Sequence, residues 1–146
     1  MQSIQKHIEE CFAKLVNRYG FRKGKELQSG ESYSIEYSSE RFVIKLEKYR
    51  HEIYVTMYKT GSDKEINLFN LLSYMEQSRS VPQSEYFEQE SNVEERYRKQ
   101  LTHLSTAIYQ NFVSIDNFFS GDDYESKAAE IDKFVMNKYP DLFKKI

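Results

Sequence analysis

The stretch over residues 31–60, ESYSIEYSSERFVIKLEKYRHEIYVTMYKT, decides the fold of this chain. Apolar and polar residues alternate through three consecutive segments of it. The apolar residues that share one face are Tyr33, Ile35, Tyr37, Phe42, Ile44, Leu46, Ile53, Val55 and Met57. Alternation with a period of two is typical of half-buried strands. The stretch therefore predicts an antiparallel meander, with turns near residues 38–41 and 49–51.

The opposite face of the meander is mixed in character instead of cleanly polar. Its residues are Val43, Lys45, Glu47, Tyr49, Tyr54, Thr56 and Tyr58. An antiparallel sheet often has one solvated face, but this face holds several aromatic side chains. It is either partly covered or used for binding, and Tyr54 and Tyr58 are candidate contact residues there.

Helical periodicity surrounds the meander. Apolar residues at spacings of three and four predict helices over residues 2–19, 63–78 and 91–119, and a fourth helix after Asp122 or Asp123. Gly20 is expected in the left-handed conformation that follows many helices. Residues 21–30 are read either as a short strand around residues 25–28 or as a basic loop.

The helix ends carry their own signals. Two Ser-x-x-Glu patterns, at residues 62–65 and 91–94, match capping boxes for the second and third helices. Pro140 is expected to end the fourth helix, and the tail over residues 141–146 to dock through Leu142 and Phe143.

The order of elements predicts an α+β fold. It consists of an N-terminal helix, a three- to four-stranded antiparallel meander and three C-terminal helices packed on the sheet, because no βαβ alternation occurs. A length of 146 residues suits one domain over residues 1–146. The aromatic content is unusual, with 12 Tyr, 10 Phe and no Trp. It indicates a thin core lined by tyrosine, or else an aromatic surface for a protein partner.

Charge and cysteine content exclude some classes of function. The net charge of −2 disfavours a general nucleic-acid binder. Residues 1–60 hold 11 basic and 8 acidic residues, whereas residues 61–146 hold 10 and 15. The single cysteine and the absence of a signal-peptide pattern indicate a reducing cytoplasm. The longest uncharged stretch is too polar for a membrane span, so no membrane association is expected.

No catalytic or metal-binding constellation emerges, and no cofactor is expected. Cys11 and His7 are one helical turn apart, but a buried structural thiol explains Cys11 better than a nucleophile does. His51 and His103 lack an acidic partner at a suitable spacing. The basic residues Arg18, Arg22, Lys23 and Lys25 form either a solvated loop or a contact for an acidic partner.

An acidic segment over residues 85–95 is the best candidate for a binding site. Its carboxylates surround two aromatic residues, Tyr86 and Phe87. The segment itself contains no basic residue, and the next one along the chain is Arg96. A charged rim around aromatic anchors favours fast and specific association. The predicted contact residues in this segment are Glu85, Tyr86, Phe87, Glu88 and Glu90.

The basic aromatic meander SSERFVIKLEKYRHEIYVTMYK, the acidic connector and the helical C-terminal half resemble small cytoplasmic proteins of Gram-positive bacteria. These include immunity proteins that neutralise toxins. The resemblance implies a non-enzymatic protein that binds a partner, such as a basic toxin. Two other hypotheses stay open. One is a small-molecule binder with a tyrosine-lined pocket, and the other is a homodimer formed through the sheet face of Tyr54 and Tyr58.

Overall fold

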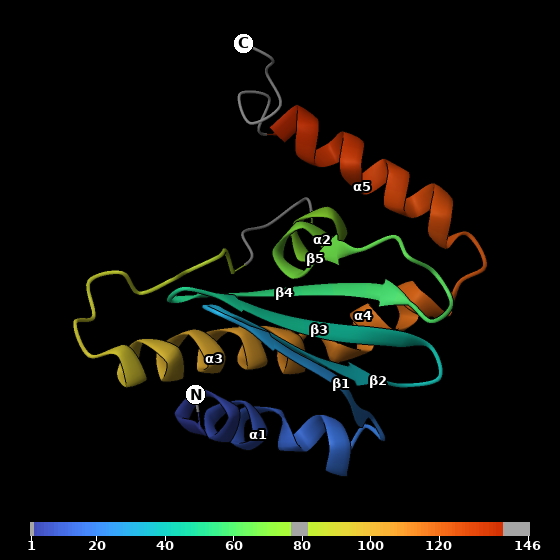
Figure 1. Cartoon of the computed structure of the whole chain (residues 1–146). Helices are drawn as coiled ribbons and strands as arrows, with labels where there is room; N and C mark the ends of the chain where they lie inside the picture. Colours follow the sequence, from blue (N-terminus) through green and yellow to red (C-terminus); the bar gives the residue numbers. More distant parts are fainter. Residues whose placement is uncertain (1, 77–81, 139–146) are drawn as a thin grey trace.

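The computed structural model of the chain describes residues 2–76 and 82–138, and it has the predicted α+β architecture (Figure 1). The strands are β1 (Arg22–Ser29), β2 (Ser32–Ser38), β3 (Phe42–Tyr49), β4 (Glu52–Lys59) and β5 (Ile66–Asn67). The helices are α1 (Gln2–Asn17), α2 (Leu68–Met75), α3 (Val93–Gln110), α4 (Phe112–Ser120) and α5 (Tyr124–Lys138). The strands form one antiparallel sheet in the order β1-β2-β3-β4-β5.

The predicted meander is confirmed in position, and its inner face is the predicted one. Rows of apolar residues cross the central strands, as in the pairing of Tyr37 with Ile44 and of Ile44 with Met57. All nine residues of the predicted inner face are buried. The second turn contains Arg50 in the left-handed region at φ 54°. Its carbonyl oxygen accepts hydrogen bonds from the Lys48 Nζ at 2.8 Å and from the Tyr97 hydroxyl at 3.2 Å.

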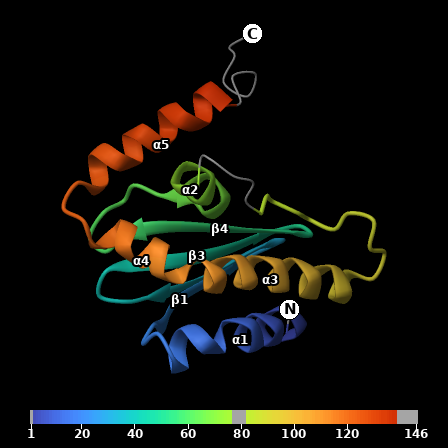
Figure 2. The same ribbon diagram turned by 180° about the vertical axis from the view of Figure 1, so that it is seen from behind.

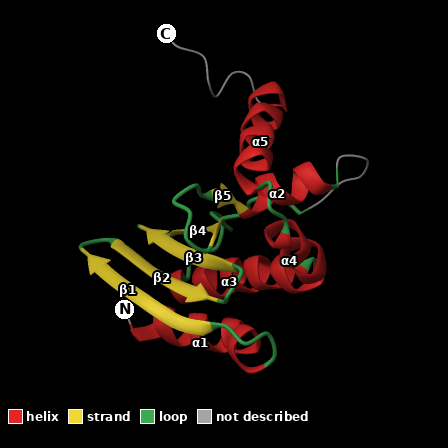
Figure 3. Ribbon diagram, turned by 90° about the vertical axis from the view of Figure 1, so that its right-hand side faces the viewer, coloured by secondary structure: helices red, strands yellow, loops and turns green. Residues whose placement is uncertain are grey.

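Helices α1, α3 and α4 cover one face of the sheet, and α1 and α3 lie side by side beneath it (Figures 1 and 2). Phe12 of α1 stacks on Tyr37 with ring centroids 6.0 Å apart, and Phe119 of α4 stacks on Phe42 at 4.6 Å. These large buried rings supply much of the apolar area that stabilises the fold. Within the described residues, no helix lies over the opposite face of strands β1 to β3 (Figure 3).

Strand β1 resolves the two interpretations of residues 21–30 in favour of a strand, and one longer than expected. Each of its eight residues is exposed. Because neither face of the strand is buried, its sequence shows no alternation of apolar and polar residues. A bulge between Lys23 and Glu26 interrupts its pairing with β2. The strand forms because backbone hydrogen bonds hold it to β2, and not because one of its faces is buried.

The predicted start of the second helix at residue 63 is wrong. Helix α2 begins at Leu68, and the Asn67 Oδ1 caps it by accepting hydrogen bonds from the amides of Phe69 and Asn70. The Ser62 hydroxyl accepts the Lys64 amide at 3.1 Å and donates to the Glu125 carboxylate at 3.0 Å. Its side chain therefore ties a loop to α5 instead of capping a helix.

The predicted continuous helix over residues 91–119 is also wrong, because it breaks at Asn111. This residue has φ −116° and ψ 14°, and its side chain donates to the Ala107 carbonyl at 2.8 Å. The apolar stripe continues across the break, which explains why periodicity did not reveal it. At the other end Asn92, and not Ser91, caps α3 through a bond from the Glu95 amide at 3.0 Å.

Other predicted ends are confirmed where the structure describes them. Gly20 follows α1 with φ 74°, and α5 begins directly after Asp123. The predicted end of the second helix at residue 78, the stop at Pro140 and the docking of Leu142 and Phe143 lie outside the described residues.

Candidate functional site

The acidic segment crosses one end of the sheet and leads into α3 (Figure 1). Its backbone is held by its own side chains. The Glu85 Oε1 accepts the Phe87 amide at 3.0 Å, and Phe87 adopts the left-handed conformation at φ 50°. The Glu90 Oε1 accepts the Asn92 amide at 3.2 Å. The segment therefore has a defined conformation before any partner arrives.

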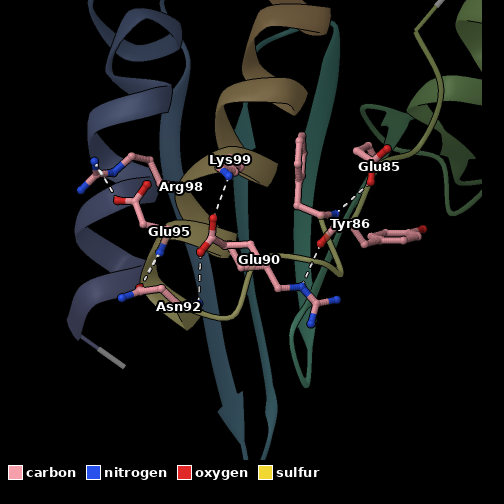
Figure 4. Close-up of polar contacts among 9 residues, drawn as sticks. Glu85, Tyr86, Glu90, Asn92, Glu95, Arg98 and Lys99 are labelled. Carbon is pink, nitrogen blue, oxygen red and sulfur yellow. Dashed lines mark hydrogen bonds and ion pairs between the residues drawn. The ribbon is translucent and has the colours of Figure 1, made fainter.

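Tyr86 packs on the sheet through Tyr54. The two rings meet edge to face with centroids 5.5 Å apart and an interplanar angle of 61°. The Arg96 Nε of α3 donates to the Tyr86 carbonyl at 2.8 Å, one of the contacts drawn in Figure 4. The structure thus brings together two candidates that lie 32 positions apart, one from the sheet face and one from the acidic segment.

Phe87 points to a different neighbour, His103 of α3. Its ring meets the imidazole edge to face at 6.1 Å, and the imidazole also stacks on Phe69 at 5.4 Å. The His103 Nε2 lies 2.7 Å from the Gln83 carbonyl oxygen, so this nitrogen carries the proton and donates it. Phe87 is half-buried and fixes the segment to α3, which makes it more a structural anchor than a contact residue.

Basic residues of α3 neutralise part of the acidic segment. Lys99 pairs with Glu90 at 2.7 Å, and Arg98 pairs with Glu95 at 3.0 Å (Figure 4). The hydrogen bond from Lys99, followed by the one from the Asn92 amide, lowers the pKa of Glu90. Glu85 and Glu88 are exposed and form no ion pair with the part of the chain that the structure describes.

The negative charge around the tyrosine pair is increased by Glu52, which sequence reasoning missed. The Tyr54 hydroxyl donates to the Glu52 carboxylate. This hydrogen bond and partial burial raise the pKa of Tyr54 above its ordinary value. Burial, and then the charges of Glu52 and Glu88, raise the pKa of Tyr86. We call these residues, Glu52, Tyr54, Glu85, Tyr86 and Glu88, the tyrosine–carboxylate surface.

A sequence signal for Glu52 existed. Residues two apart on a strand share a face, so Glu52 lies beside Tyr54 once β4 is accepted as a strand. Tyr86 gave no comparable signal, because the residues before α3 have no periodicity that would place them on the sheet.

Tyr58 is not part of this surface. It lies four residues further along β4, about 13 Å away at the rise of an extended strand. Its hydroxyl donates to the Glu36 Oε2 at 2.9 Å, and burial together with this bond raises its pKa to about 12. Lys45, nearby on the same face, pairs with Glu65 at 3.4 Å. In this half of the outer face, the polar side chains pair with one another.

The remaining candidates have structural partners. Burial raises the pKa of the Cys11 thiol, the opposite of what activates a cysteine nucleophile. The Nδ1 of His51 lies 3.2 Å from the Tyr97 hydroxyl oxygen. The basic cluster divides, because Lys23 pairs with Glu9 at 3.0 Å whereas Arg18 and Arg22 line a groove elsewhere. Among the described residues, no group of three or more His, Cys, Asp or Glu side chains could hold a metal ion.

The interior beside Tyr54 is well filled. The hollow between β4, α2 and α3, lined among others by Tyr54, Tyr86, Phe69 and Leu104, has a volume of about 10 Å³. A space of this size holds one water molecule at most.

Comparisons with known proteins add no assignment. The chain matches none of the protein-family models, curated proteins or solved structures with which it was compared. Within residues 2–76 and 82–138, no helix has the length and apolar character needed to span a membrane.

Proposed function

We propose that this chain is a non-enzymatic protein-binding protein, and that its partner is a basic protein bound at the tyrosine–carboxylate surface. The observation that carries the proposal is the packing of Tyr86 on Tyr54 beside three carboxylates, Glu52, Glu85 and Glu88. Neutralisation of a basic toxin, the role of an immunity protein, is one function of this kind.

The geometry suits recognition because the aromatic rings are already ordered. Tyr54 and Tyr86 are partly exposed and fixed by each other, by Glu52 and by Arg96. Ordering a flexible side chain at an interface costs about 0.5–1.5 kcal/mol, and rings held in place avoid most of that cost. Tyrosine is also enriched among the residues that dominate binding energy.

The carboxylates favour a cationic partner. Glu85 and Glu88 are exposed and pair with no described basic residue. A Lys or Arg of a partner can therefore form an ion pair with either of them. Charges at the rim of an interface mainly accelerate association and make it sensitive to salt. The filled interior beside Tyr54 favours this proposal over a tyrosine-lined pocket for a small molecule.

The test is a binding assay with the partner captured from the native host, followed by Tyr54→Ala and Tyr86→Ala in the purified protein. Each substitution is expected to weaken binding by roughly 30-fold or more, the loss for an interface residue worth about 2 kcal/mol. Glu85→Gln and Glu88→Gln are expected to slow association and reduce its salt dependence.

Tyr58→Ala is the matched control, because Tyr58 lies on the same strand and face and also bonds a carboxylate. It is expected to bind like the unaltered chain. A Tyr58→Ala loss as large as that of Tyr54→Ala, or full binding by the Tyr54→Ala/Tyr86→Ala double variant, contradicts the proposal. Circular dichroism of each variant separates lost binding from lost folding.

A further inference from the structure

A groove opens at the end of the sheet opposite to the acidic segment, where α1 leads into β1 and β2 turns into β3 (Figure 1). Its volume is about 810 Å³. Three arginines line it: Arg18 after α1, Arg22 at the start of β1 and Arg41 in the β2–β3 turn. The sequence separates Arg41 from the other two, so the basic cluster predicted from sequence did not include it.

The local fold sets two of these arginines around a buried anchor. Phe21 is only 3% exposed, and its amide donates to the Leu15 carbonyl at 2.9 Å. Gly20, at φ 74°, makes the sharp change of direction between α1 and β1 that lets Phe21 enter the core. Arg18 and Arg22 therefore lie on either side of a fixed point, and both side chains border the groove.

The third arginine is placed by the turn between β2 and β3. The Ser39 Oγ accepts the Arg41 amide at 3.3 Å and the Phe42 amide at 3.2 Å. Phe42 is fully buried and stacks on Phe119. The turn that carries Arg41 is thus fixed to the core by the residue that follows it.

The guanidinium groups keep donors available for a ligand. Arg18 lies over the Tyr19 ring at 5.5 Å, and Tyr19 stacks on Phe112 at 3.8 Å. Such contacts use the face of the guanidinium and leave its N–H groups, which lie in its plane, free. Arg22 forms no ion pair with any residue that the structure describes. Among the described residues, Arg41 pairs with Asp116 alone, through its Nη1 at 2.6 Å.

We propose that this groove binds a small polyanion whose oxygen atoms are closely spaced, either a phosphorylated compound or a compound with several carboxylates. Planar guanidinium groups bind such oxygens through paired N–H donors. Three of them line this groove, together with two acidic residues, Glu40 and Asp116. The volume lies within the range of small-molecule sites. The groove shares no residue with the tyrosine–carboxylate surface. This proposal is therefore independent of the proposed function.

Glu40 leads to a prediction in the opposite direction, that a substitution tightens the binding of the anion. Glu40 is exposed at the groove and forms no ion pair with the described part of the chain, so its charge repels an anion. Glu40→Gln removes one repelling charge and is expected to tighten binding severalfold. A general loss of folding cannot produce tighter binding, so this variant keeps the test decisive.

The experiment is isothermal titration calorimetry of the full chain with pyrophosphate, and in parallel with citrate. Saturable binding of pyrophosphate alone identifies a phosphorylated ligand, and binding of citrate alone identifies a carboxylate ligand. Arg18→Gln and Arg22→Gln are each expected to weaken binding about tenfold, as for the loss of one charge-assisted hydrogen bond.

Lys25→Gln is the matched control, because Lys25 is an exposed basic residue of β1 that does not line the groove. This variant is expected to bind the anion within about twofold of the unaltered chain. Salt largely screens the charge of an exposed lysine from an anion that it does not contact. The proposal is overturned if neither probe binds saturably, if Lys25→Gln weakens binding as much as Arg22→Gln, or if Glu40→Gln weakens it.

Discussion

Gln100 shows how much a single buried residue contributes to this fold. Its side chain is fully buried on α3, beside the first half of β4, where the short strand β5 does not pair with it. The Oε1 accepts the Ile53 amide at 2.8 Å, and the Nε2 donates to the His51 carbonyl at 2.7 Å. The amide group therefore takes the place of a neighbouring strand, and it supplies a partner to the buried Ile53 amide and to the partly buried His51 carbonyl.

Gln100→Leu is expected to destabilise the protein by about 2–4 kcal/mol, because the buried Ile53 amide loses its partner at a cost of about 1–3 kcal/mol and the His51 carbonyl loses a hydrogen bond worth about 1 kcal/mol. Urea denaturation followed by circular dichroism measures the change in the free energy of unfolding. Gln110→Leu, at an exposed position in the last turn of the same helix, is the control and is expected to be nearly neutral. Equal stability of the two variants would contradict the role given to Gln100.

At the scale of residues, the sequence predicted which side chains of the strands point inward but not their specific partners. Tyr54 was correctly placed on the outer face, since alternation determines faces. Its contact with Tyr86 depends on the path of an irregular segment, which no pattern encodes. The pairing of Glu90 with Lys99 was missed for a related reason: it joins residues from before and within α3 across nine positions.

At the scale of elements, helix α2 illustrates how two similar signals compete. Ser62 and Glu65 have the spacing of a capping box, yet the cap in the structure is Asn67. Asparagine alone is a weaker sequence signal than a paired motif. The residues between the two positions form a loop and the short strand β5.

Asn67→Ala is expected to cost about 1 kcal/mol of stability, because the amides of Phe69 and Asn70 lose the oxygen that caps them. Asn70→Ala, inside the same helix, is the matched control and is expected to be neutral or slightly stabilising, since alanine has the higher helix propensity. Thermal unfolding of both variants tests the pair. A larger loss for Asn70→Ala would rule out Asn67 as the cap.

The elements predicted best were those whose burial follows one period without interruption, namely α1 and β2 to β4. Strand β1 lacked this signal because every residue of RKGKELQS is exposed. The break between α3 and α4 was hidden because Ile108, Phe112 and Ile115 keep helical spacing across Asn111. Periodicity reports on the buried face and is insensitive to backbone geometry at a single residue.

At the scale of the whole molecule, the tyrosines connect stability to alkaline pH. Burial, as the main cause, raises the pKa of Tyr37, Tyr58, Tyr109 and Tyr124 to about 12. In the unfolded chain these groups titrate near their ordinary value of about 10. The native state therefore holds protons that the unfolded chain releases, and the resulting stability is present below about pH 10 and lost as the pH rises toward 12.

We expect one cooperative alkaline transition between about pH 10 and 12, in which the phenolate absorbance of these four tyrosines appears together with the loss of far-ultraviolet circular dichroism. The coincidence arises because these tyrosines ionise mainly when the protein unfolds. Phenolate absorbance that rises to completion near pH 10, while the circular dichroism stays native, would contradict the burial of the rings.

The pairing of α1 with α3 joins parts of the chain that are made at very different times. The Tyr109 hydroxyl donates to the Cys11 carbonyl, 98 positions earlier, at 2.7 Å. A ribosome that adds about 5–20 residues per second needs about 5–20 s to cover that distance. During this interval the side of α1 that will meet α3 has no native partner, although its sheet-facing side can pack as soon as the meander forms. During synthesis this side of α1 is therefore open to aggregation, and a chaperone that covers it would act in this interval.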